Sequence, residues 1–453
     1  MNKKDIRINI PERANLIVKT LQDAGYEAYV VGGCVRDEIL KRDPDDWDIT
    51  TSALPRQVKA LFRRTVDTGL KHGTVTVMQG DEGFEVTTYR IDGQYEDGRH
   101  PKNVEFTRSL EEDLKRRDFT INAMAYNDRD GLVDLFDGLG DMERKVIRCV
   151  GDPVERFSED ALRMLRAVRF SAQLSFSIDP ATEAAISKLS PNLEKISAER
   201  IHTELIKLLV SDNPMQLRKA YETGMTKVFL PEFDKAMETD QKHIHHCYSV
   251  GEHILHSVDQ VPATPVLRLA MLLHDIGKPE TLSVDENGTT HFRGHPAVSM
   301  EMAKKILRRL KLDNDTIDKV SVLVRYHDYG NGKEADEKTV RKAMSKIGAD
   351  LFPDFLEVRR ADCLAQSDYK RQEKLDNLEA WGKIYKDILE KKQCFCLKDM
   401  KITGRELMEL GVKPGPLMGE ILQKLLEEVI DDPDKNDEEY LRKRARELAQ
   451  ETN

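Results

Sequence analysis

The spacing of hydrophobic residues along the chain changes near residue 150. Before that point, short apolar runs at 28–31, 74–78 and 84–90 alternate in the manner of β-strands, and a Gly-rich turn would join the last two as a hairpin. Residues 11–24 have the spacing of an amphipathic helix, and a closing strand is expected over 132–153. The first 150 residues therefore predict a small α/β unit.

After residue 155 the pattern becomes helical and stays so to the end of the chain. Long stretches rich in Leu, Lys, Glu and Arg place apolar residues at helical spacing, and charged residues make up 34% of the 453 residues. Such a length allows several hydrophobic cores. We predict an α+β protein with four parts, at 1–150, 151–235, 236–370 and 371–453, of which the last three are mostly helical.

Charge and targeting features narrow the choice of function only slightly. The net charge of −10 argues against a generally basic nucleic-acid-binding protein, but it is compatible with a local basic stripe. The first residues lack the apolar core of a signal peptide and no window approaches a membrane span, so we expect a cytoplasmic protein that does not bind membranes. The six cysteines are scattered along the chain, and we expect them to be reduced.

The strongest chemical signal follows the first predicted strand. Asp46 and Asp48 lie two apart before an Ile-Thr-Thr strand, where side chains at i and i+2 point to the same side. Two carboxylates placed in this way can hold a pair of divalent cations for in-line phosphoryl transfer. Gly32 and Gly33 would let a triphosphate approach the backbone, and Arg36 would add a cation. A simple Asp-x-Asp turn is the alternative, but the combination favours catalysis.

Other features of the first 150 residues are candidates for contacts with a nucleotide. Glu85 would be a third carboxylate, although an exposed strand residue is an equally good interpretation. The polar, Gly-containing segment 91–109 indicates a loop that touches a nucleotide or an RNA end. Arg117 ends a basic cluster before Asp118, which we expect at a helix start, and it is our preferred contact to the phosphates or ribose. A capping Asp beside surface arginines would have the same pattern.

The predicted helix 155–174 carries an acid and three arginines in steps of three. Asp160, Arg163, Arg166 and Arg169 would share one face, which is usually a solvated face with weak ion pairs. Hydrogen-bond chemistry offers another interpretation, because a carboxylate only accepts and a guanidinium only donates. Cytosine and adenine show an amino donor beside a ring-nitrogen acceptor, whereas uracil and guanine show a carbonyl beside an N–H. A pair of Asp160 and Arg163 would therefore select C and A without a nucleic-acid template.

Four separated motifs, GGCVRD, DWD, RRDFTINA and EDALRMLRAVRF, resemble in this order those of class II tRNA nucleotidyltransferases (CCA-adding enzymes) and bacterial poly(A) polymerases. The resemblance covers roughly residues 25–215. It implies a polymerase-β-like head that holds two magnesium ions at Asp46 and Asp48. It also implies nucleotide contacts from Gly33, Arg36, Arg117, Asp160, Arg163, Arg166 and Arg169. Residues 196–209 resemble the helix that supports the nucleotide-selecting helix in this family.

Histidines are concentrated in the second half of the chain. Nine of the 12 histidines lie within 85 residues, between positions 243 and 327. His274 and Asp275 follow an apolar helix, His253 lies on the helix before it, and Asp362 lies on a later helix. Neutral imidazoles and carboxylates that come from different helices are the usual ligands of a metal site.

This stretch resembles the HD domain of metal-dependent phosphohydrolases. The resemblance implies that His253, His274, Asp275 and Asp362 bind one divalent cation, for which Mn, Ni, Mg and Fe are the candidates. It also implies that His295 and His327 serve a second metal or a phosphate and that Lys278 contacts phosphate. The remaining histidines at 243, 245, 246 and 256 are expected to include surface residues. A relic HD fold that serves as an RNA-binding body is the alternative.

We therefore expect an enzyme that adds C, C and A to tRNA 3′ ends from CTP and ATP and releases pyrophosphate. By analogy with the family, the helical tail at 371–453 would hold the acceptor and T arm of tRNA. An enzyme that adds only A or only CC, or a poly(A) polymerase, is the nearest alternative. An HD phosphohydrolase with a regulatory head is the alternative from another class, and the complete head motifs argue against it. The oligomeric state stays open.

Overall fold

The computed structural model of the chain describes residues 3–93, 104–242 and 247–451. Contacts divide the chain into two compact units, Met1–Pro231 and Glu232–Asn453. The first unit combines a sheet with helices, and the second is almost entirely helical. The predicted α+β class is therefore confirmed, whereas the finer division into four parts stays a prediction.

The N-terminal part of the first unit is built on a seven-stranded sheet in the order β3-β4-β5-β2-β1-β8-β9. β2 runs parallel to β5, and the other neighbours are antiparallel. Every residue of β1, β2 and β8 is buried, which places these strands in the core of the sheet. The strands are β1 (Ala28–Val31), β2 (Ile49–Thr51), β3 (Thr65–Gly69), β4 (Thr74–Gln79), β5 (Glu82–Thr88), β8 (Met124–Asn127) and β9 (Gly131–Asp134).

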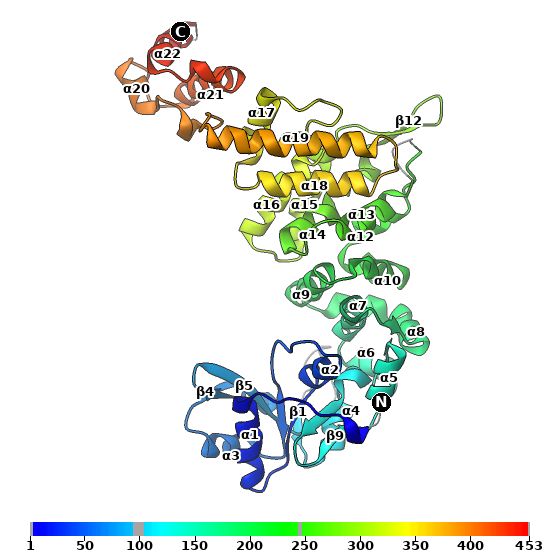
Figure 1. Cartoon of the computed structure of the whole chain (residues 1–453). Helices are drawn as coiled ribbons and strands as arrows, with labels where there is room; N and C mark the ends of the chain where they lie inside the picture. Colours follow the sequence, from blue (N-terminus) through cyan, green and yellow to red (C-terminus); the bar gives the residue numbers. More distant parts are fainter. Residues whose placement is uncertain (1–2, 94–103, 243–246, 452–453) are drawn as a thin grey trace. The chain divides into compact units, whose positions relative to one another are not determined.

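Helices cover this sheet. α1 (Glu12–Asp23) and α3 (Pro55–Leu61) pack against one another and against the sheet, and α2 (Gly33–Ile39) contacts β1 and β8 (Figure 1). The predicted helix at 11–24 and the hairpin of β4 and β5 are confirmed. β6 (Arg90–Asp92) pairs with β7 (Val104–Phe106), and residues 94–103 of the predicted loop lie outside the described residues.

The closing strand expected over 132–153 was wrong. After β9 the chain forms α5 (Gly138–Arg144) and then the short strand β10 (Val146–Ile147). The carboxylate of Asp134 accepts hydrogen bonds from the N–H groups of Gly138 and Leu139, at 2.8 and 3.0 Å. Because these N–H groups belong to the first turn of α5, this side chain helps the helix to start.

The single helix expected over 155–174 was also wrong. The chain forms α6 (Pro153–Glu159) and α7 (Leu162–Leu174), with a break at Asp160, whose backbone is extended at φ −139° and ψ 103°. The carboxylate of Asp160 accepts the N–H of Leu162 at 3.0 Å and so caps the second helix. α7 packs against α9 (Ala198–Leu209), and α8 (Pro180–Leu189) packs against α6.

The second unit contains the helices α13 (Val250–Asp259), α14 (Pro265–Leu273), α15 (His295–Arg309), α16 (Asn314–Tyr326), α17 (Glu337–Ile347), α18 (Phe352–Leu364) and α19 (Arg371–Glu390). Trp381 of α19 is fully buried and lies close to Phe352 and Phe355 of α18. α20 (Gly404–Glu409), α21 (Pro416–Asp431) and α22 (Glu438–Glu451) follow and share a hydrophobic cluster of their own.

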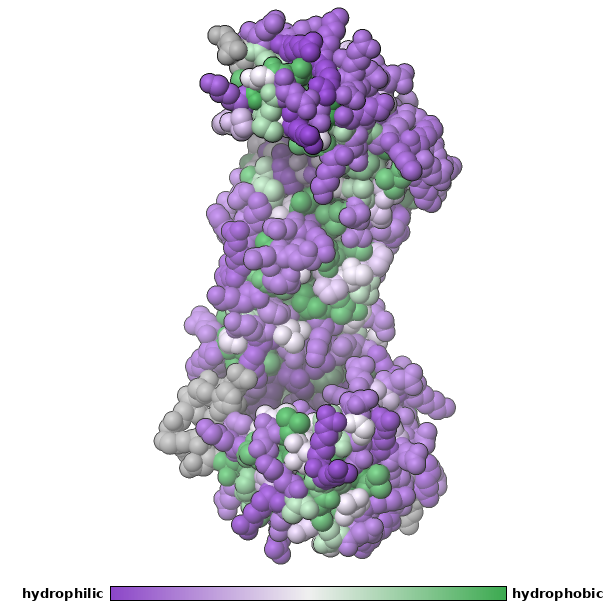
Figure 2. Space-filling model, turned by 90° about the vertical axis from the view of Figure 1, so that its left-hand side faces the viewer, coloured by the Kyte–Doolittle hydropathy of each residue, from purple (hydrophilic) through white to green (hydrophobic). Residues whose placement is uncertain are grey.

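Hydrophilic residues cover most of the face drawn in Figure 2, as the high charged fraction leads one to expect. In the basic segment of α22, Arg442 pairs with Glu409 and Glu438, and Arg444 pairs with Glu428. The guanidinium groups of Arg442 and Arg444 are therefore already paired with carboxylates of the tail. Within the described ranges, no helix has both the length and the apolar character that a bilayer crossing requires.

Candidate active site and metal centre

The paired aspartates lie at the end of the central strands. Asp46 and Asp48 directly precede β2, and the N–H of Val31 donates to the backbone oxygen of Asp48 at 3.0 Å. Ile49 lies opposite Val86 in the parallel pair of β2 and β5, so the preceding residues, Asp48 and Glu85, are neighbours. Glu85 therefore approaches the aspartates from the strand beside β2, and not from a strand beside β1.

Negative charge is concentrated at this point. Burial raises the pKa of Asp48 to about 6, and the carboxylates of Asp46 and Glu85 add to the increase. The guanidinium of Arg117 acts in the opposite direction. Crowded carboxylates with too little positive charge near them are stabilised by a cation. The residues present therefore fit a divalent metal.

A glycine turn and an arginine lie beside the carboxylates. Gly32 has φ 84°, in the left-handed region that favours glycine, and a Cβ at this position would lie 3.0 Å from Nη1 of Arg117. Arg117 forms an ion pair with the buried Asp113 at 3.6 Å, and its Nε has no hydrogen-bond partner. The structure thus brings Gly32, Arg117 and Asp48 together, and Arg117 keeps donor capacity for a ligand.

Arg36 is more deeply buried than a surface phosphate contact would be. It is 8% exposed and donates to Asp37 at 2.7 Å and to Asn122 at 2.6 Å. Its guanidinium also lies 5.0 Å from the ring centroid of Phe170 on α7. A Cβ on Gly33 would lie 3.8 Å from Arg36, so the guanidinium is next to the glycine turn. Its contact with a nucleotide stays a prediction.

The three arginines of α7 all have acidic partners. Arg163 donates to Glu159 at 2.6 Å and to the backbone oxygen of Arg116 at 3.1 Å. Arg166 pairs with Asp118 at 2.8 Å, and Arg169 pairs with Glu204 at 2.5 Å. The side chain of Arg163 therefore points toward the segment that carries Arg117. Burial alone would raise the pKa of Asp118, but Arg166, together with Asn122 and Arg163, outweighs it and lowers that pKa to about 2.

Asp160 does not pair with Arg163 through its side chain. Its carboxylate instead pairs with Arg200 of α9, at 2.7 Å between Oδ2 and Nη2. Since Asp160 lies in the break before α7, it also does not continue the face on which the three arginines lie. To contact a base, Asp160 and Arg163 would therefore have to give up their present protein partners. Their role in base selection stays a prediction.

Three participants in this network were missed or misread in the sequence. Asp118 was expected to begin a helix, but it lies between α4 (Leu110–Lys115) and the 3-10 turn Thr120–Asn122 (η3). Arg200 and Glu204 were not considered. Their spacing of four places two opposite charges on one face of α9, which is the signal that would have drawn attention to them.

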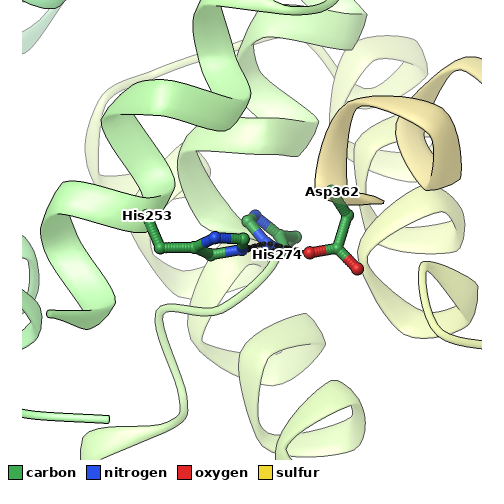
Figure 3. Close-up of side chains that lie close together, drawn as sticks. All are labelled: His253, His274 and Asp362. Carbon is green, nitrogen blue, oxygen red and sulfur yellow. Dashed lines mark hydrogen bonds and ion pairs between the residues drawn. The ribbon is translucent and has the colours of Figure 1, made fainter. Parts of the chain in front are cut away.

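The second unit brings the predicted metal ligands together. Figure 3 shows His253 from α13, His274 after α14 and Asp362 from α18 pointing toward one another. Nε2 of His253 lies 3.2 Å from Nε2 of His274 and 3.0 Å from Oδ1 of Asp362. Asp275, His295 and His327 form a second group, in which the potential ligand atoms also lie within 4.8 Å of one another.

Asp275 joins the two groups. Its Oδ2 lies 3.2 Å from Nε2 of His274, and its Oδ1 lies 3.2 Å from Nε2 of His295. The same Oδ2 also forms an ion pair with Lys278 at 2.7 Å. One carboxylate that reaches both clusters is a suitable bridge between two cations. The sequence-based prediction placed Asp275 with one cation only.

The imidazole tautomers favour metal ligation. Nδ1 of His274, His295 and His327 lies 2.7 to 2.8 Å from a backbone carbonyl oxygen, so Nδ1 carries the proton and Nε2 of the neutral ring carries the lone pair. Burial lowers the pKa of His327 to about 4, so this ring is neutral at pH 7. Lone pairs that converge with buried carboxylates need a cation between them, so the residues fit the predicted divalent metal.

The other histidines of this stretch that the structure describes belong to neither cluster. His291 pairs with Asp285 at 2.9 Å, and the ring of His256 stacks on Tyr248 at 4.2 Å between centroids. His243, His245 and His246 fall outside the described residues.

The raised pKa of Asp48 predicts a pH effect on stability. Its carboxyl binds a proton more strongly in the folded chain than at its usual value of 3.8, so this group lowers the free energy of unfolding as pH rises from about 4 to about 6. In metal-free protein, Asp48→Asn should remove this loss and stabilise the first unit by about 2 kcal/mol at pH 7. Chemical denaturation at pH 4.5 and 7 would measure it, with the exposed Asp45→Asn as control. Identical pH dependence in wild type and Asp48→Asn would contradict the prediction.

Family models match most of the chain. The "Poly A polymerase head domain" matches residues 28–148, which confirms the polymerase-β-like head. The "Probable RNA and SrmB- binding site of polymerase A" matches residues 175–237, and "tRNA nucleotidyltransferase domain 2 putative" matches residues 292–445.

Relatives match nearly the whole chain or a part of it. The CCA-adding enzyme of Ligilactobacillus salivarius is 38% identical over 452 residues, 98% of each chain, and that of Leuconostoc mesenteroides is 55% identical over 203 residues, 45% of this chain and 51% of that enzyme. The crystal structure of the Bacillus stearothermophilus CCA-adding enzyme in complex with CTP is 30% identical, with a TM-score of 0.72 over 97% of this chain and 98% of that one. The chain belongs to the CCA-adding enzyme family of tRNA nucleotidyltransferases.

Proposed function

We infer that the chain adds C, C and A to the 3′ end of tRNA from CTP and ATP, without a nucleic-acid template. The observation that carries this inference is the gathering of Asp48, Glu85, Gly32 and Arg117 at one end of the head sheet. These groups provide what nucleotidyl transfer requires, which is a cation site beside a phosphate-binding turn. The tRNA 3′ end with its acceptor and T arm, CTP and ATP are the proposed partners.

Asp46 and Asp48 are the proposed ligands of divalent metal, for which we propose magnesium, with Glu85 as a third carboxylate. Magnesium, when bound, activates the terminal 3′-hydroxyl and neutralises the triphosphate. The hydroxyl oxygen bonds to the α-phosphorus while the bond to the leaving pyrophosphate breaks. Arg117 would donate to the phosphates or the ribose, because its Nε has no partner and the glycine turn lies beside its Nη1.

The decisive assay uses tRNA transcripts that end at the discriminator base, at C or at CC, each with every one of the four nucleotides. We expect C addition to the first two and A addition to the third. Asp46→Ala with Asp48→Ala should reduce both by at least about a thousand-fold while tRNA binding persists, because the metal ligands are lost. Product sizing and fluorescence anisotropy would measure these effects, with Asp45→Ala as control. C addition to the first two transcripts without A addition to the third would instead support an enzyme that adds only CC, and A addition to the third alone would support an enzyme that adds only A.

Nucleotide selection is proposed to depend on Asp160 and Arg163, with Arg200 holding the carboxylate in place. Asp160→Ala should weaken the rejection of UTP and GTP by about ten-fold or more, since a bidentate base contact is worth about 1–3 kcal/mol. Arg200→Gln should cause a smaller change in the same direction. The exposed Lys207→Gln on the same helix is the control. Misincorporation ratios unchanged in both variants would argue against base reading at this position.

The second unit is proposed to be an HD domain with a metal-dependent phosphohydrolase activity. The observation in favour is the sharing of Asp275 between the cluster of His253, His274 and Asp362 and that of His295 and His327. The ligands could hold two divalent cations, with Mn, Ni, Mg and Fe as candidates. Two bridged cations would activate water against a phosphate ester.

His274→Ala with Asp275→Ala should remove bound metal and any hydrolysis of phosphomonoesters or cyclic phosphodiesters, because both clusters lose a ligand. CCA addition should stay within about two-fold of the wild type, since the proposed addition site lies in the other unit. Elemental analysis and the two activity assays would measure this, with His256→Ala as control. Metal retained by the double variant, or both activities lost together, would oppose the proposed separation.

A further inference from the structure

The two metal-ligand clusters open into a cavity of about 680 Å³, a volume typical of small-molecule sites. Asp275, His295, His327 and Asp362 are part of its wall. Four basic and four acidic side chains line it, and two of the acidic ones are the metal ligands Asp275 and Asp362. With divalent cations bound, the cavity would therefore carry a surplus of positive charge, which suits an anionic substrate.

Arg359 lines the same cavity and is unusual among its basic residues. It lies on α18, three residues before Asp362, so both project from one face of the helix. Arg359 is 6% exposed, and its Nη1 has no hydrogen-bond partner. Within the described part of the chain, no carboxylate lies within ion-pair distance of it. A buried guanidinium left in this way is costly unless an anion joins it.

The rest of the side chain is held firmly. Nη2 donates to Asn331 at 3.0 Å, and the guanidinium carbon lies 4.8 Å from the ring centroid of Trp381. Burial lowers the pKa of Arg359 to about 10, so the group is cationic at neutral pH. Contacts of this kind fix the planar group in place and leave one edge for an oxyanion.

We propose that Arg359 forms a second anion subsite in this cavity, so that the substrate of the HD site carries a second phosphate besides the one that is hydrolysed. This proposal rests on the proposed phosphohydrolase function. In the reaction, a water oxygen bonds to the phosphorus, the ester bond to the nucleoside oxygen breaks, and that oxygen takes up a proton. Arg359 takes no part in these steps and is a binding residue for the other phosphate.

Two sources share this chemistry, a mononucleotide with two phosphates and an RNA end whose terminal phosphate follows a phosphodiester. The probes are therefore adenosine 3′,5′-bisphosphate, adenosine 3′-monophosphate and a diadenylate with a 3′-phosphate. Binding to immobilised full-length protein loaded with Mn²⁺ would be followed by surface plasmon resonance under continuous flow, which renews the ligand. Tighter binding of the diadenylate than of the bisphosphate assigns the subsite to RNA ends, and the reverse order assigns it to free nucleotides.

The wild type should bind the better two-phosphate probe about ten-fold or more tightly than the monophosphate, and Arg359→Gln should abolish this preference with Mn²⁺ content unchanged. Arg360→Gln, which changes the adjacent arginine that pairs with Glu357, should leave it intact. Arg359→Lys keeps the charge but loses the planar guanidinium group, so we expect the preference for two phosphates to fall about three-fold. This variant serves as the test if Arg359→Gln does not fold.

A metal-loaded wild type without a preference for two phosphates, or an Arg359 variant that weakens all three probes equally, overturns the subsite and leaves the metal site standing. A preference that survives in the folded Arg359 variants also overturns it. A wild type that binds no Mn²⁺ at all overturns the HD proposal, and the subsite with it.

Discussion

Buried charge that must meet opposite charge is the constraint on which both candidate sites depend. In the head, the carboxylates around Asp48 exceed the positive charge available from Arg117, and the raised pKa of Asp48 expresses that excess. In the second unit, neutral imidazoles and the carboxylates of Asp275 and Asp362 direct their lone pairs toward common points. Both arrangements are electrostatically unfavourable without a cation and become favourable when one binds. The fold therefore holds the ligands in place before the cation arrives.

The arginines of helix α7 obey the same constraint. Its arginines are held by acids from other parts of the first unit, and Asp160 is held by Arg200 of α9. In the proposed base contact, side chains fixed in this way would lose little freedom, so more of the interaction energy would remain for discrimination. A protein that selects nucleotides without a template needs this rigidity, because no pairing strand orders the incoming base.

Local features of the site were predictable from the sequence, and features that depend on packing were not. The aspartate pair, the glycine turn and the predicted metal ligands of the second unit follow from short motifs and from helix spacing. The neighbour of Asp48 across the sheet depends on strand order, which places β5 beside β2. The partner that Arg169 finds in Glu204 depends on the packing of α7 against α9. The break before α7 was missed because steps of three fit a continuous helix, whereas the carboxylate of Asp160 caps a new one.

The ion pair between Arg169 and Glu204 has a consequence for sequence drift. The side chains are 8% and 6% exposed, so replacing Glu204 alone would leave the Arg169 cation buried without a carboxylate, at a cost of about 3–5 kcal/mol. Replacing Arg169 alone would leave Glu204 with only its longer ion pair to Arg166, at 3.5 Å. A sequence in which only one of these two residues has been replaced is therefore expected to be destabilised. We expect positions 169 and 204 to covary among homologues, changing as a unit or not at all, while the exposed positions of the same two helices diverge independently.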